Sequence, residues 1–237
     1  MMKIPGWVAA ILLVLGVTRT GAVVLSSGHI DVIGINYEAG AWDLHVHDED
    51  TDTEYEPDEV VTHISDAGKV TVPVNPLFAF LGSPGSVVWI GPQVQNPLLP
   101  FLGISAEELD GTVFDAPDIT LTLTGFSGPL GGKFFLYQTD GFGVPTVFIN
   151  TDDGLSSADN VIVPEGSHAH YNWAFTTNGT YFLTFTASGT LAGGGFTSDL
   201  ATWEFLIGDL AAVPEPGTAL LMLLGGGLLW ARRRKER

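Results

Sequence analysis

Residues 42–48 read Trp-Asp-Leu-His-Val-His-Asp, and this alternation of apolar and polar side chains decides the fold class. Successive side chains of an extended strand point to opposite faces, so residues two apart share a face. The apolar members therefore face a core, whereas Asp43, His45 and His47 face the other way. The preceding residues 29–37 are rich in Ile and Val and end in a Gly-containing turn at residues 38–40, which predicts a β-hairpin.

Short segments of the same kind recur along the chain, separated by turns rich in Gly, Asn and Asp. This spacing predicts an all-β domain, an antiparallel immunoglobulin-like β-sandwich. One helix is expected at residues 105–109, because Ser105 and Glu108 have the spacing of a capping box. The strands expected after the hairpin are residues 60–64, 69–74, 86–90, 119–124, 133–138, 144–150, 168–176, 181–186 and 202–207.

The chain of 237 residues is strongly acidic, with 27 Asp and Glu against 9 Lys and Arg. Between residues 23 and 213 the only basic residues are Lys69 and Lys133. Such a domain repels phosphate backbones, which excludes nucleic acid as a partner and makes divalent cations the natural counter-charge. Cysteine is absent, so any metal must be held by nitrogen and oxygen ligands.

Residues 1–22 are predicted to be a secretory signal peptide. Lys3 gives a positive start, residues 7–17 are apolar, and Ala22 is the expected last residue removed. The apolar run is short for a membrane span, although an uncleaved anchor is the alternative. The β-sandwich domain is then expected to occupy residues 23–212, outside the cytoplasm.

Residues 213–237 have a distinct order of features. Pro214-Glu215-Pro216 is followed by an apolar segment at residues 219–231 and a basic cluster at residues 232–237, which favours the cytoplasmic side of a membrane. This order resembles the PEP-CTERM sorting signal of Gram-negative bacteria that make extracellular polysaccharide. The resemblance implies export to the cell envelope, at least transient membrane anchoring through the helix 219–231, and processing by an exosortase. An ordinary C-terminal anchor is the alternative.

A second His-x-His sequence, His168-Ala169-His170, occurs late in the chain. Two doublets can offer four imidazoles to one cation, so we predict a metal site; exposed strand histidines in a half-polar sheet are the alternative. Zinc is the expected ion, with nickel, copper and calcium left open. The predicted ligands are His45, His47, His168 and His170, with His29 as a substitute or fifth ligand and Asp31 or Asp48 as a ligand or orienting group.

The acidic loop expected at residues 48–59 contains eight carboxylates. Its Asp-x-Asp-x-Asp start has the alternating spacing of a calcium loop, but Thr53 stands where an EF-hand needs Gly, which disfavours that geometry. We expect a solvated loop that raises the local concentration of cations beside the histidines.

Three segments together resemble the choice-of-anchor M, or actinobacterial-type surface-anchored, domain. They are Gly28-His29-Ile30-Asp31, Leu44-His45-Val46-His47-Asp48-Glu49, and residues 166–175 from Gly166 to Phe175. The resemblance implies a surface protein that captures a transition metal, zinc above all, beside a metal-uptake transporter. It also implies ligand roles for His29, His45, His47, His168 and His170.

The sequence thus favours an exported, non-enzymatic metal-binding surface protein. The alternative is a structural or adhesive protein of the extracellular polysaccharide matrix, with no specific transition-metal site. Catalysis is not expected, because no Gly-x-Ser-x-Gly, His-Glu-x-x-His or phosphate-loop sequence occurs. Ser167 and His168 are adjacent on an expected strand and so face opposite ways.

Overall fold

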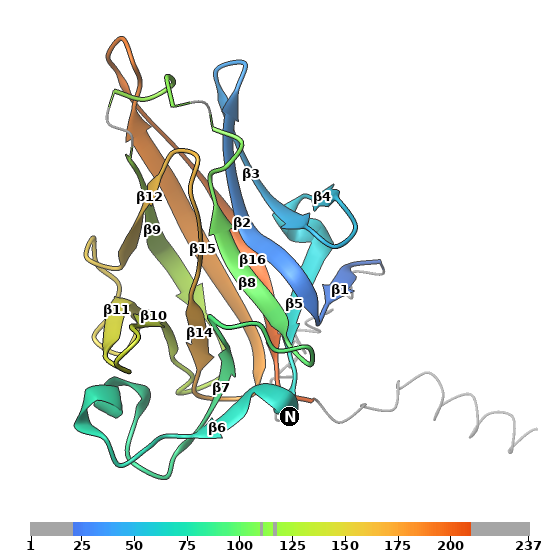
Figure 1. The fold of residues 1–237 in the computed structure, drawn as a ribbon, viewed down its shortest axis with the longest axis vertical. Coiled ribbons are helices and arrows are strands. Elements are labelled where there is room, and N and C mark those ends of the chain that lie inside the picture. The colour runs from blue at the N-terminus through green and yellow to red at the C-terminus, as the bar shows by residue number, and fades with distance from the viewer. Residues whose placement is uncertain (1–20, 110, 116–117, 210–237) are drawn as a thin grey trace, which may run out of the picture.

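The computed structural model describes residues 21–109, 111–115 and 118–209, which form three β-sheets (Figure 1). The all-β prediction is confirmed. The predicted signal peptide falls almost entirely on residues 1–20, and the Pro-Glu-Pro motif and the apolar helix 219–231 lie wholly outside the described residues. The strands are β1 (Val23–Leu25), β2 (Gly28–Glu38), β3 (Ala41–Asp48), β4 (Thr53–Tyr55), β5 (Val60–Ile64), β6 (Lys69–Thr71), β7 (Val87–Gly91), β8 (Pro100–Ser105), β9 (Asp118–Ser127), β10 (Phe134–Thr139), β11 (Pro145–Asn150), β12 (Asn160–Pro164), β13 (His168–His170), β14 (Asn172–Phe175), β15 (Gly179–Thr190) and β16 (Phe196–Ile207).

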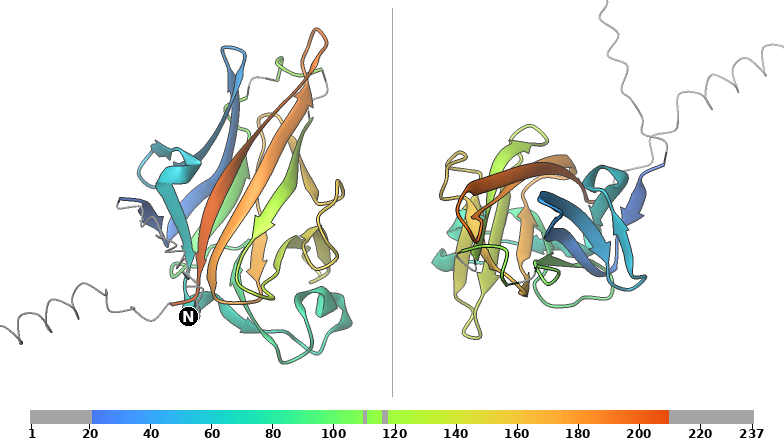
Figure 2. Two further views of the ribbon diagram at one scale, coloured as in Figure 1. Left: turned by 180° about the vertical axis from the view of Figure 1, so that it is seen from behind. Right: turned by 90° about the horizontal axis from the view of Figure 1, so that it is seen from above.

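Short 3-10 helices are the only helices among the described residues: η1 (Pro57–Glu59), η2 (Asp66–Gly68) and η3 (Pro76–Leu81). The sheets have the strand orders β1-β5-β16-β15-β9-β12, β11-β10-β14-β7-β6 and β13-β8-β2-β3-β4. The hairpins β2–β3 and β15–β16 extend to the same end of the molecule (Figures 1 and 2).

The prediction of a purely antiparallel sandwich is wrong in part. Strand β5 pairs in parallel with both β1 and β16, and β2 pairs in parallel with β8. Parallel neighbours cannot be joined by a tight hairpin and need a long crossover connection. The chain between β2 and β8 provides this crossover and places the two strands side by side in one sheet.

One contiguous hydrophobic core contains side chains from all three sheets. Trp173 of β14 stacks on Phe205 of β16 with the ring centroids 5.4 Å apart, and Phe185 of β15 meets the same indole edge-on. All three side chains are fully buried. Because β14 and β16 belong to different sheets, this aromatic contact holds two sheets together.

The helix predicted at residues 105–109 does not form. Ser105 is the last residue of β8 and pairs with His168 of β13. The Ala106 N–H then donates to the Ser167 carbonyl at 2.8 Å, and the Ala106 carbonyl accepts from the Gly166 N–H at 2.9 Å. After β8 the chain makes only a single turn, in which the Leu109 N–H donates to the same Ala106 carbonyl at 3.1 Å, so tertiary pairing overrides the capping-box signal.

The acidic segment 48–59 is more ordered than the predicted loop. It contains β4, which extends the sheet beyond β3 with His47 opposite Glu54, and the 3-10 helix η1. Asp48 ends β3 and accepts hydrogen bonds from the Asp50 N–H and the Thr51 hydroxyl. The Asp48 carboxylate is therefore held against the turn that follows β3.

The stacked indole of Trp173 gives a direct test of this core. Replacing it in Trp173→Ala removes a fully buried aromatic side chain and should lower the free energy of unfolding by about 3–5 kcal/mol. Phe142→Ala is the matched control, because Phe142 is 95% exposed and its loss should change stability by less than about 0.5 kcal/mol. Urea unfolding of the two variants measures both effects, and equal midpoints would contradict the assigned core.

Candidate metal centre

The sheet β13-β8-β2-β3-β4 collects the predicted ligands on one face. In the strand register His170 lies opposite Gly103, Gly103 opposite Asp31, Asp31 opposite His47, and His47 opposite Glu54. Directly opposite residues point to the same face. Side chains of four strands, all of types that can bind metals, therefore form a row across this sheet, and Gly103 of β8 leaves the gap between His170 and Asp31.

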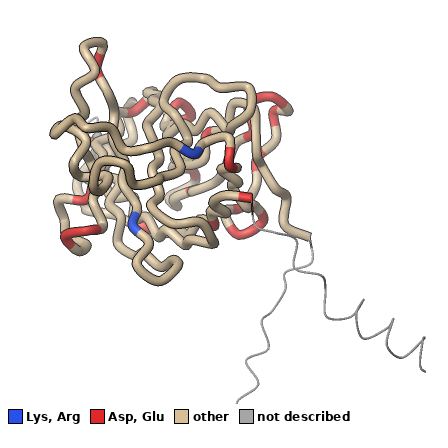
Figure 3. Tube along the Cα trace, turned by 90° about the horizontal axis from the view of Figure 1, so that it is seen from below, with Lys and Arg blue, Asp and Glu red and all other residues tan. Residues whose placement is uncertain are grey.

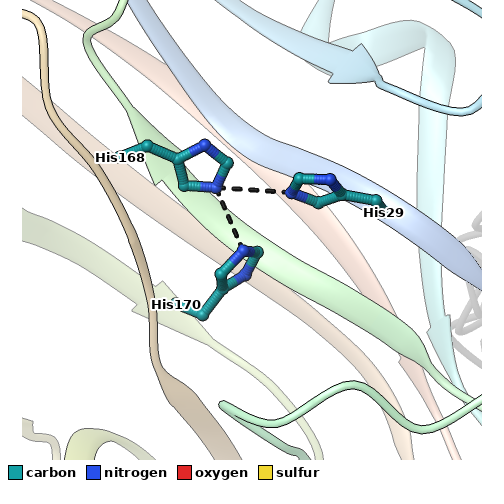
Figure 4. Close-up of side chains that lie close together, drawn as sticks. All are labelled: His29, His168 and His170. Atoms are coloured by element: carbon teal, nitrogen blue, oxygen red, sulfur yellow. Dashed lines mark hydrogen bonds between the residues drawn. The ribbon is translucent and has the colours of Figure 1, made fainter.

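Three imidazoles meet at one end of this row (Figure 4). The Nε2 atom of His168 lies 3.1 Å from His170 Nε2 and 3.4 Å from His29 Nε2. His29 comes from β2 and the other two from β13, and β8 passes beneath them between the two strands. The three rings converge through the same nitrogen, the arrangement in which three imidazoles can coordinate one ion.

The carboxylate of Asp31 lies beside two of these imidazoles. Its Oδ1 atom lies 3.0 Å from His168 Nε2 and 3.7 Å from His29 Nε2. Asp31 is 1% exposed, and this oxygen is buried without a hydrogen-bond partner. Burial raises the pKa of Asp31, while the neighbouring His168 partly offsets that rise.

Glycine at position 103 makes room for this contact. A Cβ atom there would overlap Asp31 Oδ1 and would lie 2.7 Å from His168 Nε2. The missing side chain on β8 thus allows Asp31 from one neighbouring strand to meet His168 from the other. An isolated Gly within a strand often marks such a close approach.

These nitrogens and the oxygen cannot satisfy one another by hydrogen bonding alone. A ring nitrogen carries either one proton or one lone pair, yet His168 Nε2 faces two nitrogens and one carboxylate oxygen. A cation bound by the three imidazoles would satisfy their Nε2 atoms, and Asp31 Oδ1 lies close to two of these nitrogens. Ligands about 2.0–2.1 Å from a tetrahedral zinc ion are separated by about 3.3–3.4 Å, close to the spacing observed.

His170 has a lowered pKa, so its ring can be a neutral ligand. The pKa of His170 is lowered to about 4, mainly by burial; a hydrogen bond with the Leu102 backbone opposes this shift, and the nearby His168 and His29 rings add to it. Its ring stacks on Phe101, with the centroids 3.4 Å apart and the planes at 15°. The stacking fixes the direction in which the Nε2 lone pair points.

Glu107 lies behind His168 and can orient that ring. Its Oε2 atom is 3.5 Å from His168 Nδ1, the nitrogen that faces away from the cluster. A carboxylate at this position favours a proton on Nδ1 and leaves Nε2 free for a metal. Sequence reasoning missed Glu107 because it placed residues 105–109 in a helix; the isolated Gly103 was a usable signal of close packing at this place.

The other predicted ligands lie elsewhere on the sheet. Strands β8 and β2 separate β13 from β3, so the two His-x-His doublets are about 14 Å apart at the backbone. His47 contacts Glu49 through Nδ1 at 3.1 Å and Asp52 through Nε2 at 3.4 Å. Asp48 caps the following turn, and His45 lies beside Glu54 and Glu108. The strand order therefore joins His168 and His170 with His29 and Asp31 and leaves His45 and His47 in separate surroundings.

Little positive charge is available to neutralise this face. The only basic side chains among the described residues, apart from histidine, are Lys69 and Lys133, whereas acidic residues occur all around the domain (Figure 3). Lys69 pairs with Asp66 at 3.1 Å and Lys133 with Asp152 at 3.2 Å. Neither ion pair includes a residue of the histidine cluster, so a bound cation would be the natural counter-charge of this acidic face.

Comparison with known proteins identifies the C-terminal segment. The family model of the PEP-CTERM protein-sorting motif matches residues 212–235, which include Pro214, Glu215 and Pro216. The predicted sorting motif is confirmed, and it indicates bacterial export, cell-surface sorting and recognition by an exosortase. No curated protein and no solved structure matches the chain. Within residues 21–109, 111–115 and 118–209, no helix is long and apolar enough to cross a membrane.

The lowered pKa of His170 can be measured directly. In metal-free protein its ring should titrate near pH 4, so that it stays neutral at about pH 5, where an ordinary histidine with a pKa of 6.5 is mostly charged. NMR titration of the ring protons measures this, with the resonance assigned by its absence from His170→Asn. The unfolded chain takes up this proton at higher pH than the folded chain. The folded state should therefore lose stability as the pH falls from about 6.5 to about 4. A midpoint near 6.5 would show that the ring is solvated.

Proposed function

We propose that this exported, exosortase-sorted surface protein binds a divalent transition metal, with zinc as the expected ion, and that it does so without catalysis. The ligands are His29, His168 and His170, with the carboxylate of Asp31 in the fourth position. The convergence of three Nε2 atoms beside a buried carboxylate oxygen that lacks a hydrogen bond is the observation that supports this most strongly.

The donor set favours a borderline metal ion. Imidazole nitrogen suits zinc, copper and nickel, whereas calcium and magnesium prefer sites made of oxygen alone. Three imidazoles and one carboxylate match the number and type of ligands in tetrahedral zinc sites. The charge fits as well, because a doubly charged ion meets one carboxylate in a face that is already acidic.

The setting of the domain supports capture of metal outside the cell. The PEP-CTERM motif directs the chain to the cell surface, and we propose that its apolar segment 219–231 anchors the protein at least transiently in the membrane of a Gram-negative envelope. We further propose that the domain is of the choice-of-anchor M type and passes its metal to an uptake transporter. The acidic segment 48–59 would raise the cation concentration beside the site.

Zinc binding by the full chain tests the proposed ligands. Purified protein should retain zinc, and His168→Ala should weaken its binding to the three-histidine site more than about 100-fold, because it removes the nitrogen at the centre of the cluster. Glu107→Gln should weaken it about 10–100-fold through loss of ring orientation. Competition with a chelating dye measures the affinities, and His63→Ala, on β5, is the control that should leave them unchanged. Unaltered affinity in His168→Ala would exclude this site.

The glycine beneath the cluster gives an independent test. Gly103→Ala changes no ligand residue. Its Cβ atom would nevertheless push Asp31 and His168 apart and should weaken zinc binding about tenfold or more. Gly141→Ala is the matched control, because a Cβ atom there meets no atom within 4 Å. The same dye competition compares the two variants, and equal affinities would mean that Asp31 and His168 do not act together.

A further inference from the structure

A second group of ligand atoms lies on the same sheet, on the far side of β2 from His168 and His170. It contains His45 of β3, Glu54 of β4 and Glu108 from the segment after β8, each offering one ligand atom within 4.8 Å of the others. Glu108 Oε1 lies 3.7 Å from His45 Nε2. Three separate stretches of the chain thus bring one imidazole and two carboxylates together.

His45 is the unusual member of this group, because it is 5% exposed and its ring is packed into the sheet. The ring covers Gly34, its partner on β2, where a Cβ atom would overlap the ring atoms. The Nδ1 atom of His45 is buried without a hydrogen-bond partner. An imidazole buried without a hydrogen bond is costly in free energy, and the long 3.5 Å contact of Nδ1 with Asp43 offsets that cost only in part, so a cation at Nε2 would stabilise the buried ring.

Neighbouring groups hold these side chains in place for coordination. Asn36 donates a hydrogen bond to Glu108 Oε2 at 2.9 Å, which leaves the other oxygen, Oε1, directed at His45. Asp43 Oδ1 lies 3.5 Å from His45 Nδ1 and is the carboxylate that can accept its proton when Nε2 binds a cation. Such outer carboxylates set the tautomer of metal-binding histidines.

This group is distinct from the three-histidine cluster but opens toward it. A small pocket lies between the two, and its walls include His45, Glu108, Glu107 and Asp31. Asp31 belongs to the first cluster, and His45 and Glu108 to the second. An ion that enters this pocket meets the carboxylates of Asp31, Glu107 and Glu108 and the imidazoles of His45 and His47.

We propose that His45, Glu54 and Glu108 form a second divalent cation site, additional to the one at His29, His168 and His170. The imidazole in this group favours borderline ions such as zinc, copper and nickel over calcium and magnesium. Two carboxylates balance the charge of one divalent ion. Because Glu54 and Glu108 are exposed, the second site is more accessible to solvent and exchanges its ion faster than the first.

Zinc serves as the probe, and the full chain is titrated by calorimetry and native mass spectrometry. Wild-type protein should bind two zinc ions, whereas His45→Ala and Glu108→Gln should each bind one, with the affinity of the lost site reduced about 100-fold or more. Glu108→Gln preserves the shape of the side chain, so it remains informative if His45→Ala does not fold. Glu38→Gln, at the tip of the β2–β3 hairpin, is the exposed control and should bind two ions.

The same titration separates this proposal from the first site. Loss of one ion in His168→Ala together with loss of the other in His45→Ala supports two independent sites. A wild-type chain that binds a single ion, lost only in His168→Ala, overturns the second site and leaves the first. A single ion that is kept in His168→Ala and lost in Glu108→Gln overturns the first and leaves the second. Two ions retained in both His45→Ala and Glu108→Gln overturn the second site outright.

Discussion

The register of one five-stranded sheet controls the chemistry of this domain. Strands β13, β8, β2, β3 and β4 are aligned so that histidines and carboxylates share one face, and glycine occupies the positions between them. At Gly103 and Gly34 the absent side chains leave space for Asp31, His168 and His45 to lie across neighbouring strands. A shift of one residue in any of these pairings would turn the ligands to the opposite face.

A second consequence of this strand register is that polar groups are buried on that face. Asp31 and His45 are almost fully inaccessible, although each keeps an atom without a hydrogen-bond partner. A soluble domain removes such groups from water only at a free-energy cost. The metal coordination that we propose would offset that cost, and it would account for the convergence of the imidazoles of His29, His168 and His170.

The surroundings favour cations over other ligands. The domain has few positive side chains, and its two lysines are already paired with aspartates, so anions find no attractive surface near the cluster. The ordered acidic segment between β3 and η1 places further carboxylates beside the same sheet. A sorting motif that sends this chain to the cell surface places the face in contact with the external medium.

The sequence by itself determined the all-β class, the β2–β3 hairpin and the sorting motif, because these depend on local alternation, turn residues and composition. His29, Asp31, His168 and His170 are four of the seven ligands that it predicts, and the structure brings these four side chains close together. Only the tertiary structure decided which of them meet, since that depends on β13 pairing with β8 and on the parallel pairing of β8 with β2 across a long crossover. The same long-range pairing drew Ser105 into a strand, which placed Glu107 and Glu108 beside the histidines, and no local pattern in residues 105–109 contains that information.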